Sequence, residues 1–343
     1  MLHSQSPKQH LLTFFIAIPF FLFFLLSLQT GLAQQINNKS ASIIFDSDIG
    51  PDYDDVGAIT ILHALEDKGE AKILATVASN KYEGIAAVLD VFNTYFHRAG
   101  IPIGVPKGEA VNLRDSQHWT DSILAKYPHK IKSNAEVPDA VEVYRKVLAS
   151  QPDHSVTIVT VGFLTNLANL LKTKGDHFSP LSGKALIEKK VKLLVSMAAK
   201  FPEGKEFNVE KDAKASKEAL ESWPTRVIFS GFEIGAKIKT GLPLIHNNNI
   251  HKNPAKDAFR ICIPMSKEDA GGRMSWDQTA VLVAVRGYQP YYTLHPGKIK
   301  VAVDGSNSWD ENGKGQYYLV EKESPKKVQD IIDDLMMQLP KKQ

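Results

Sequence analysis

Five aspartates stand within ten residues near the amino end of the chain, directly after a run of apolar side chains. They are Asp46, Asp48, Asp52, Asp54 and Asp55. Clustered carboxylates repel one another, so such a group is tolerated mainly where a cation or strong hydrogen-bond donors neutralise it. A divalent cation that prefers oxygen ligands is the simplest explanation. Alternatively, the last three aspartates could be first-turn residues of a helix, where the positive end of the helix dipole favours acidic side chains.

The elements around these aspartates should place them at one edge of a sheet. Residues 43–45 predict a buried strand, Gly50-Pro51 predicts a turn, and residues 56–62 predict a helix. The carboxylates would then lie at the carboxyl end of a strand, where open α/β sheets bind their ligands. Further strands are predicted at 72–77, 101–105, 156–160, 191–197 and 226–229, and further helices at 84–96, 138–148, 164–171, 213–221, 279–285 and 325–339.

This alternation predicts an α/β fold, a single Rossmann-like domain with a mostly parallel central sheet flanked by helices. We see no internal repeat and no low-complexity linker that would divide it. Three polar segments are expected to be irregular loops over the ligand crevice, at 111–135, 247–257 and 304–315.

The first 33 residues are typical of a secretory signal peptide. Lys8 is their only formally charged residue, residues 11–28 are almost all apolar, and small residues precede Gln34. Cleavage is expected after Ala33, which leaves a domain of residues 34–343 and a periplasmic or secreted protein. Alternatively, the segment could stay uncleaved as an anchor, because 18 apolar residues nearly span a bilayer.

Composition excludes several classes of function. The formal charge of +3 among 343 residues is not that of a nucleic-acid-binding protein. The only cysteine, Cys262, lies between two isoleucines, so no internal disulfide is possible and a buried structural thiol is expected. The sequence has no CxxC or HExxH motif, which argues against zinc.

Two distant segments could complete a cation site with the first one. Val161 follows a predicted strand and could offer its backbone carbonyl, and Asp277 stands at the start of a helical run. Carboxylates from separate segments together with a carbonyl make an oxygen-only shell, which suits Ca²⁺.

These segments resemble the nucleoside hydrolase family. The first is similar to the family's amino-terminal motif Asp-x-Asp-Pro-Gly-x-Asp-Asp, with two extra residues in the turn. The similarity continues through Thr76–Asn80, Gly162–Asn166, Glu206-Phe207-Asn208 and Trp276-Asp277, in the family's order. The resemblance implies the family's fold and Ca²⁺-dependent hydrolysis of the N-glycosidic bond of small-molecule ribonucleosides, often by homo-oligomers.

The resemblance also implies roles for particular residues. The Ca²⁺ ligands would be the carboxylates of Asp48, Asp55 and Asp277 and the carbonyl of Val161. Asp48 would also be the general base that takes a proton from the attacking water. The residues around the ribose would be Asp54, Asn80, Glu206 and Asn208.

The position before the last metal-binding aspartate concerns the leaving base. Many family members have a histidine there, whereas this chain has Trp276, as in the purine-preferring branch, where an indole stacks on the base. Trp119 could supply a second stacking face, and His118 could be the acid that protonates the base. Alternatively, Trp276 only packs the crevice wall, and His118 is an ordinary surface residue.

Two other functions remain open from the sequence. Asp46-Ser47-Asp48 after a strand also resembles the opening motif of haloacid-dehalogenase-type phosphatases, which use Mg²⁺. The chain could also be a periplasmic riboside-binding protein that kept the site and lost turnover. If it is an exported hydrolase, salvage of extracellular nucleosides, purines above all, is the expected role, with no membrane contact beyond an uncleaved signal segment.

Overall fold

The computed structural model describes residues 1–3 and 40–341. Apart from its first three residues, the expected signal peptide therefore lies outside the described part of the chain. Residues from Ser40 onward form one compact unit. Within the described residues, no helix is both long and apolar enough to cross a lipid bilayer.

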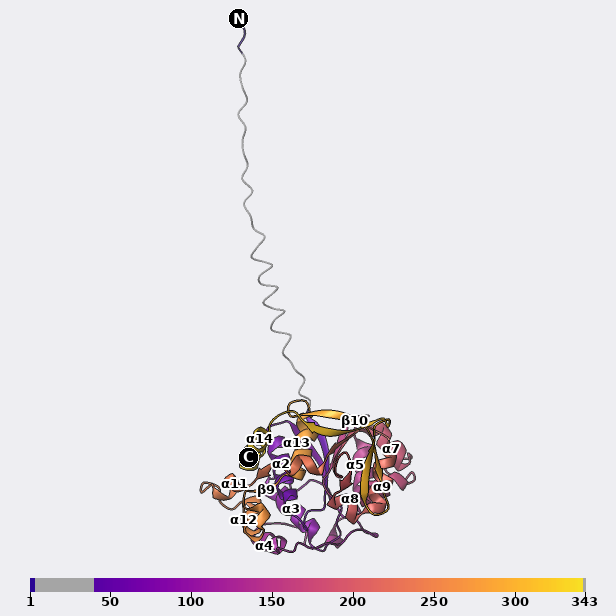
Figure 1. Ribbon diagram of the computed structural model, residues 1–343, viewed down its shortest axis with the longest axis vertical. Helices are drawn as coiled ribbons and strands as arrows, with labels where there is room; N and C mark the ends of the chain where they lie inside the picture. Colours follow the sequence, from indigo (N-terminus) through magenta and orange to yellow (C-terminus); the bar gives the residue numbers. More distant parts are fainter. Residues whose placement is uncertain (4–39, 342–343) are drawn as a thin grey trace. The chain divides into compact units, whose positions relative to one another are not determined.

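The unit is built on one sheet of ten strands, in the order β3-β2-β1-β4-β5-β7-β12-β10-β11-β6 among the described residues (Figure 1). The seven strands from β3 to β12 pair in parallel, and the last three add antiparallel pairs at the β12 edge. The strands are β1 (Ala41–Ser47), β2 (Ala71–Ala78), β3 (Ile103–Gly104), β4 (Val156–Thr160), β5 (Val191–Met197), β6 (Gly204–Lys205), β7 (Val227–Ser230), β10 (Tyr292–Val301), β11 (Ser306–Asp310) and β12 (Gln316–Glu321). A separate two-stranded sheet pairs β8 (Lys239–Thr240) with β9 (Arg273–Met274).

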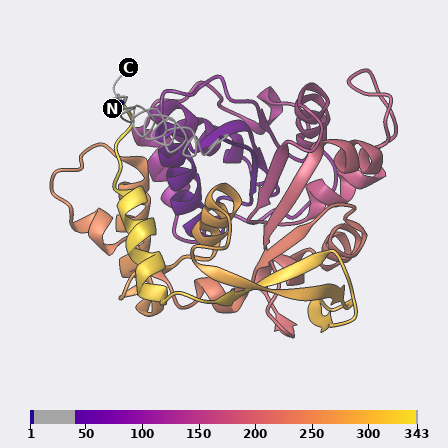
Figure 2. The ribbon, with the colours of Figure 1, turned by 90° about the horizontal axis from the view of Figure 1, so that it is seen from above.

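Helices cover both faces of the sheet, which confirms the predicted fold class. One core contains apolar side chains of α2, α3, α13 and α14, and the other contains those of α5, α6, α7 and α9. Helix α14 packs against α2 and α13 (Figure 2). The helices are α2 (Asp54–Asp67), α3 (Ile85–Tyr95), α4 (Trp119–Lys126), α5 (Ala140–Ser150), α6 (Thr165–Lys172), α7 (Gly183–Lys190), α8 (Phe207–Lys211), α9 (Ala213–Ser222), α10 (Phe232–Gly235), α11 (Leu242–His246), α12 (Pro254–Cys262), α13 (Trp276–Arg286) and α14 (Pro325–Met336).

The strands alternate their side chains between these two cores. Ile43 and Phe45 of β1 belong to the first core, and Ile44 between them belongs to the second. Because both faces are buried, the parallel strands read as continuous apolar runs, and this is why the sequence predicts them well. Cys262 is fully buried at the end of α12, as expected.

Sequence reasoning was wrong in the three segments expected to be irregular. Helix α4 lies within 111–135, α12 begins within 247–257, and β11 occupies part of 304–315. The antiparallel strands have an exposed face, so their apolar residues are interrupted. Helix α4 is short and half polar, and its burial of Trp119 is a tertiary contact that local patterns do not reveal.

The carboxyl ends of β1, β2 and β4 meet at one point of the sheet. The amide of Ser79 donates to the carbonyl of Ser47 at 2.8 Å, and that of Val161 donates to the carbonyl of Asp46 at 2.8 Å. A Cβ atom on Gly162 would come within 2.3 Å of the Asp48 amide nitrogen, so only glycine permits this approach. The residues that follow these strands are therefore neighbours.

Candidate active site

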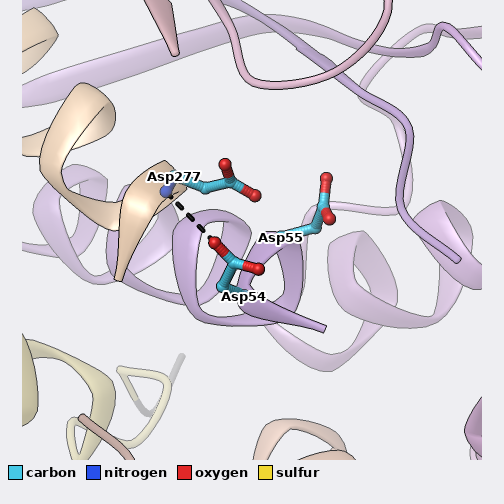
Figure 3. A group of neighbouring side chains, drawn as sticks. All are labelled: Asp54, Asp55 and Asp277. Atoms are coloured by element: carbon cyan, nitrogen blue, oxygen red, sulfur yellow. Dashed lines mark hydrogen bonds between the residues drawn. The ribbon is translucent and has the colours of Figure 1, made fainter. Parts of the chain in front are cut away.

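Three carboxylates from two helices converge at this edge of the sheet. Asp54 and Asp55 open α2, and Asp277 is the second residue of α13. Figure 3 shows the three side chains around a common space, and one oxygen from each lies within 4.8 Å of the others. The backbone amide of Asp277 also lies 3.4 Å from Asp54 Oδ2, as a long hydrogen bond. The prediction that these distant segments meet in space is confirmed.

Asp48 lies at the end of β1 beside this group. It is buried, and the nearby charges of Asp55, Asp52 and Asp54 all raise its pKa. The hydroxyl of Ser47 donates to Asp55 Oδ1 at 2.5 Å and accepts from the amide of Ile49, so it ties the end of the strand to the start of α2. The group that lies within metal-ligand spacing contains Asp54, whereas the resemblance assigned Asp48 to that shell.

The local electrostatics are those of a site with an excess of acidic groups. Burial raises the pKa of Asp48, Asp54 and Asp277 well above the ordinary value for aspartate, and the neighbouring carboxylates raise it further. Burial, followed by the charge of Asp52, raises the pKa of Asp55 to about 7 even though Ser47 donates to it. Burial and mutual repulsion both disfavour the charged form of such carboxylates, and a bound cation would offset both effects.

The donor set fits a hard divalent cation. All the convergent side-chain atoms are carboxylate oxygens, and no histidine or cysteine belongs to the group among the described residues. Asp55 and Asp277 would hold the ion, with Asp48 and the Val161 carbonyl approaching from the strand ends. A cation would supply the positive charge that these buried carboxylates lack.

The structure brings Asn208 and Val161 together. The side-chain amide of Asn208 donates to the Val161 carbonyl at 3.0 Å and lies 3.3 Å from the Met197 carbonyl. Asn208 therefore links the ends of β4 and β5, and it lies in direct contact with a carbonyl proposed as a metal ligand.

Glu206 caps helix α8 rather than extending freely into a pocket. One carboxylate oxygen accepts from the amide of Asn208 at 2.8 Å, and the other accepts from the amides of Ala199 at 3.0 Å and Val209 at 3.2 Å. Burial raises the pKa of Glu206 to about 7 despite these donors. In this structure its first task is to hold the turn that presents Asn208.

Asn80 secures the loop that follows β3 against the end of β1. Its amide nitrogen donates to the carbonyls of Leu113, at 2.7 Å, and Asp48, at 3.3 Å, and its oxygen accepts from the amides of Leu113 and Tyr82. Asn80 thus lies at the site, and both ends of its side chain are already used by backbone groups.

A family model described as inosine-uridine preferring nucleoside hydrolase matches residues 43–335. The chain belongs to this family. As a family member it is an N-glycosyl hydrolase of ribonucleosides, and the phosphatase alternative is dropped. A comparison with curated proteins finds no match.

Solved structures share the fold of this nucleoside hydrolase at low sequence identity. They include an inosine-uridine preferring nucleoside hydrolase from Bacillus anthracis, at 14% identity and a TM-score of 0.66, with 87% of this chain and 99% of that chain covered. A purine-preferring ribonucleoside hydrolase from Gardnerella vaginalis has 17% identity and a TM-score of 0.67, with coverages of 86% and 99%. The type III effector protein XopQ, solved with adenosine diphosphate ribose, has 14% identity and a TM-score of 0.62, with coverages of 93% and 98%.

The nucleoside hydrolase presents an aromatic pair beside the carboxylates. The Trp276 indole N–H donates to the Phe232 carbonyl at 2.8 Å, and the two rings lie 5.2 Å apart at 31°. Trp276 is partly exposed, and Phe232 is 37% exposed. A Cβ atom on Gly235 would lie 2.3 Å from the Trp276 Cα, so glycine lets α10 approach the start of α13.

The structure places Trp119 and His118 differently from expectation. Trp119 is fully buried, and its indole N–H donates to the Gly50 carbonyl at 3.2 Å, so it offers no free face for stacking and instead anchors α4 under the acidic turn. His118 is exposed at the start of α4, with Nδ1 3.4 Å from the Asp121 carboxylate. Trp119 as a stacking residue is therefore corrected, and His118 as a leaving-group acid stays a prediction.

Sequence reasoning missed Arg273 in β9, whose guanidinium contacts Asp52 and Asp54. A single arginine after Gly271-Gly272 signals only a turn. Its partners stand more than two hundred residues away in the chain, so no local pattern could have revealed the contact.

Proposed function

We propose that this nucleoside hydrolase is a Ca²⁺-dependent enzyme that is exported and prefers purine ribonucleosides. The observation that carries the proposal is the set of buried carboxylates of Asp54, Asp55 and Asp277, which come within 4.8 Å of one another. Six- to eight-oxygen coordination by carboxylates, carbonyls, water and substrate hydroxyls is the coordination that Ca²⁺ prefers.

The reaction replaces the bond between C1′ of the ribose and the base nitrogen with a bond to water oxygen. A bound Ca²⁺ would lower the pKa of the attacking water and orient the ribose hydroxyls. Asp48 takes the proton of the water as its oxygen attacks C1′, and the electron pair of the broken bond leaves with the base. The surrounding carboxylates stabilise the positive charge that develops on the sugar, which lowers the barrier more than it tightens substrate binding.

The preference for purines is proposed on the aromatic pair of Trp276 and Phe232. Both rings are partly exposed beside Asp277, and a larger base would have more contact area with them. The purine-preferring relative from Gardnerella vaginalis is consistent with this proposal.

The experiment is a measurement of free-base and reducing-sugar release by residues 34–343 with Ca²⁺. Inosine, guanosine, adenosine, cytidine and uridine would each be tested, before and after removal of divalent cations. We expect purine release that a chelator abolishes and Ca²⁺ restores. Faster release from uridine than from inosine would contradict the purine preference and leave the hydrolase intact.

Two further outcomes separate the remaining alternatives. Trp276→Leu should weaken the preference for inosine over uridine. The control is Trp223→Leu, at the carboxyl end of α9, which should leave that preference unchanged. Tight binding of inosine by calorimetry without release of base would favour the riboside-binding alternative instead.

Export is proposed on the first 33 residues alone. Expression of the full chain with a carboxyl-terminal tag in a Gram-negative host should give a protein in the periplasmic fraction. Amino-terminal sequencing should then begin at Gln34. Recovery of the intact chain in the membrane fraction would favour the anchor alternative.

A further inference from the structure

Arg273 makes an unusual set of contacts at the mouth of the carboxylate site. Its Nη2 lies 3.2 Å from Asp54 Oδ1 and also pairs with Asp52, and its Nη1 lies 3.6 Å from Asp269 Oδ1. Its side chain is only 11% exposed. The Arg273 guanidinium is thus shared by three carboxylates, and one of them, that of Asp54, belongs to the proposed ribose pocket.

Aromatic rings fix the guanidinium from the side. Its central carbon lies 5.1 Å from the centre of the Tyr53 ring and 5.0 Å from that of Trp276. The Tyr53 hydroxyl donates to Asp269 Oδ2 at 2.7 Å, so the tyrosine also holds one of the acidic partners. Planar arginine pairs with carboxylates and stacks on rings, and a lysine would not reproduce both contacts.

This arrangement accounts for the two extra residues in the acidic turn. Asp52 and Tyr53 lie in the lengthened part of the turn between Asp48 and Asp54, and both contact the Arg273 side chain. The lengthened turn therefore adds an ion-pair partner and an aromatic wall for Arg273.

The contacts restrict the orientation of the Asp54 carboxylate. Oδ1 faces Nε of Arg273, at 3.4 Å, and Nη2, and Oδ2 faces the backbone amide of Asp277. Each carboxylate oxygen has two acceptor sites, so Asp54 can still accept from a ribose hydroxyl while it is held in this way.

We propose that Arg273 is a positioning residue for sugar recognition. It holds the Asp54 carboxylate in the orientation in which it accepts a hydrogen bond from the 2′-hydroxyl of a riboside. This inference rests on the proposed function, since it takes the ribose pocket as given. Its consequence is that the preference for ribosides over 2′-deoxyribosides depends on Arg273, a residue outside the family's aspartate motifs.

The test compares Arg273→Lys and Arg273→Gln with the wild type, using inosine and 2′-deoxyinosine with Ca²⁺. A lost hydrogen bond to a charged group corresponds to about a 10- to 100-fold effect, so kcat/KM for inosine should fall by that factor in both variants. For 2′-deoxyinosine we expect less than about a 3-fold fall, because the contact that Arg273 supports is already missing. The preference for ribose should therefore collapse.

Arg286→Gln is the matched control. Arg286 is the last residue of α13, the helix that carries Asp277 in its first turn, and it pairs bidentately with Glu70 away from the carboxylate site. This variant should keep the wild-type ratio of the two kcat/KM values. Thermal melting of every variant identifies any loss of folding, and Arg273→Lys, which keeps the charge, remains interpretable if Arg273→Gln does not fold.

The outcomes separate this inference from the function on which it rests. Equal losses on both nucleosides, or no loss on either, with wild-type turnover intact, would overturn the role of Arg273 alone. If the wild type binds inosine without cleaving it, calorimetry gives the ratio of its affinities for inosine and 2′-deoxyinosine. A collapse of that ratio in the Arg273 variants would support the role of Arg273, and an unchanged ratio would overturn it. Binding of neither nucleoside by the wild type would overturn the proposed function, and the inference with it.

Discussion

Two largely buried arginines of this molecule have different charge environments. Arg145 in α5 is 2% exposed, and its guanidinium binds Asp176 through two nitrogens, together with the Thr173 hydroxyl and the carbonyls of Ser179 and Leu181. One positive charge meets one negative charge, and neutral acceptors satisfy the remaining N–H groups. Such a closed arrangement holds the loop after α6 against α5 and has no capacity left for a ligand.

Arg273 lies instead among an excess of acids. Three carboxylates contact it, and Asp55 and Asp277 lie just beyond, close to Asp54. The difference shows which buried charges serve folding and which serve function: a structural ion pair is balanced, whereas this site keeps negative charge that only an added cation or a cationic transition state can balance.

The largest effect should come from removing an acid from the unbalanced region. Asp48→Ala should lower kcat for inosine by about 10²–10⁴-fold, since a general base typically contributes that much. Because Asp48 is buried without an ion-pair partner of its own among the described residues, the cation-free variant should melt no lower than the wild type. Base release and thermal melting measure the two effects, and near wild-type turnover would refute Asp48 as the base.

The ion pair of Arg145 and Asp176 should respond in the opposite way. Arg145→Met should cost about 1–3 kcal/mol of unfolding free energy, because it leaves the carbonyls of Ser179 and Leu181 without their donor. Turnover per folded molecule should not change. Denaturant titration and steady-state kinetics provide the measurement, with Lys146→Met, the exposed neighbour on α5, as control. A changed KM in the folded variant would contradict the separation of the two regions.

Binding of Ca²⁺ should stabilise the site of Asp54, Asp55 and Asp277, where acidic groups are in excess. A concentration of Ca²⁺ one hundred times the Kd should raise the unfolding free energy by about 2.7 kcal/mol. Thermal melting of cation-free protein against Ca²⁺ concentration measures this effect. Asp277→Asn should reduce it and Asp176→Asn should not, so equal responses of these two variants would place the ion elsewhere.

The smallest effect is a difference in pH dependence. Burial and neighbouring acids raise the pKa of Asp55 to about 7, above its unfolded value, so the cation-free protein loses this contribution to stability as pH rises through about 7. Arg145 lowers the pKa of Asp176 in the folded protein. The contribution of Asp176 to stability is therefore present above the pKa that this carboxyl has in the unfolded chain, and it is lost as the pH falls through its folded-state pKa.

Denaturation of cation-free protein at about pH 5.5 and about pH 8 should therefore show lower stability at the higher pH, and Ca²⁺ should remove part of the difference. The comparison of cation-free with Ca²⁺-loaded protein is the control, because the buried Asp46 and Glu206, whose pKa values are also raised to about 7, contribute equally to both. A pH dependence that Ca²⁺ leaves unchanged would assign the effect to those two groups.

The parts of the fold that the sequence predicted well are those whose burial is uniform. Strand β4 is buried throughout and β5 is buried from Leu194 onward, and their observed bounds equal the predicted runs of 156–160 and 191–197. The antiparallel strands β10, β11 and β12 have an exposed face, and the sequence did not predict them because their apolar pattern is broken by polar residues.

The candidate site, like the fold, contains residues that the sequence placed correctly and residues that it did not. Asp48 and Val161 were predicted at the site because each follows a parallel strand, and parallel strands align their carboxyl ends, whereas Asn80 was predicted there from the family resemblance. Trp119 was misjudged, since the same tryptophan can stack on a ligand or fill a core and its neighbours in sequence do not decide between them.

The sequence by itself determined the α/β class, the family and the acidic edge of the sheet, because strand runs, helix periods and motif spacing are local and carry over into any packing. Only the tertiary structure decided that Arg273 holds Asp54, 219 residues earlier in the chain, and that Glu206 is committed to capping α8. Those outcomes depend on which buried donors and acceptors meet once the elements pack, and a buried polar group must take the partner that packing places beside it.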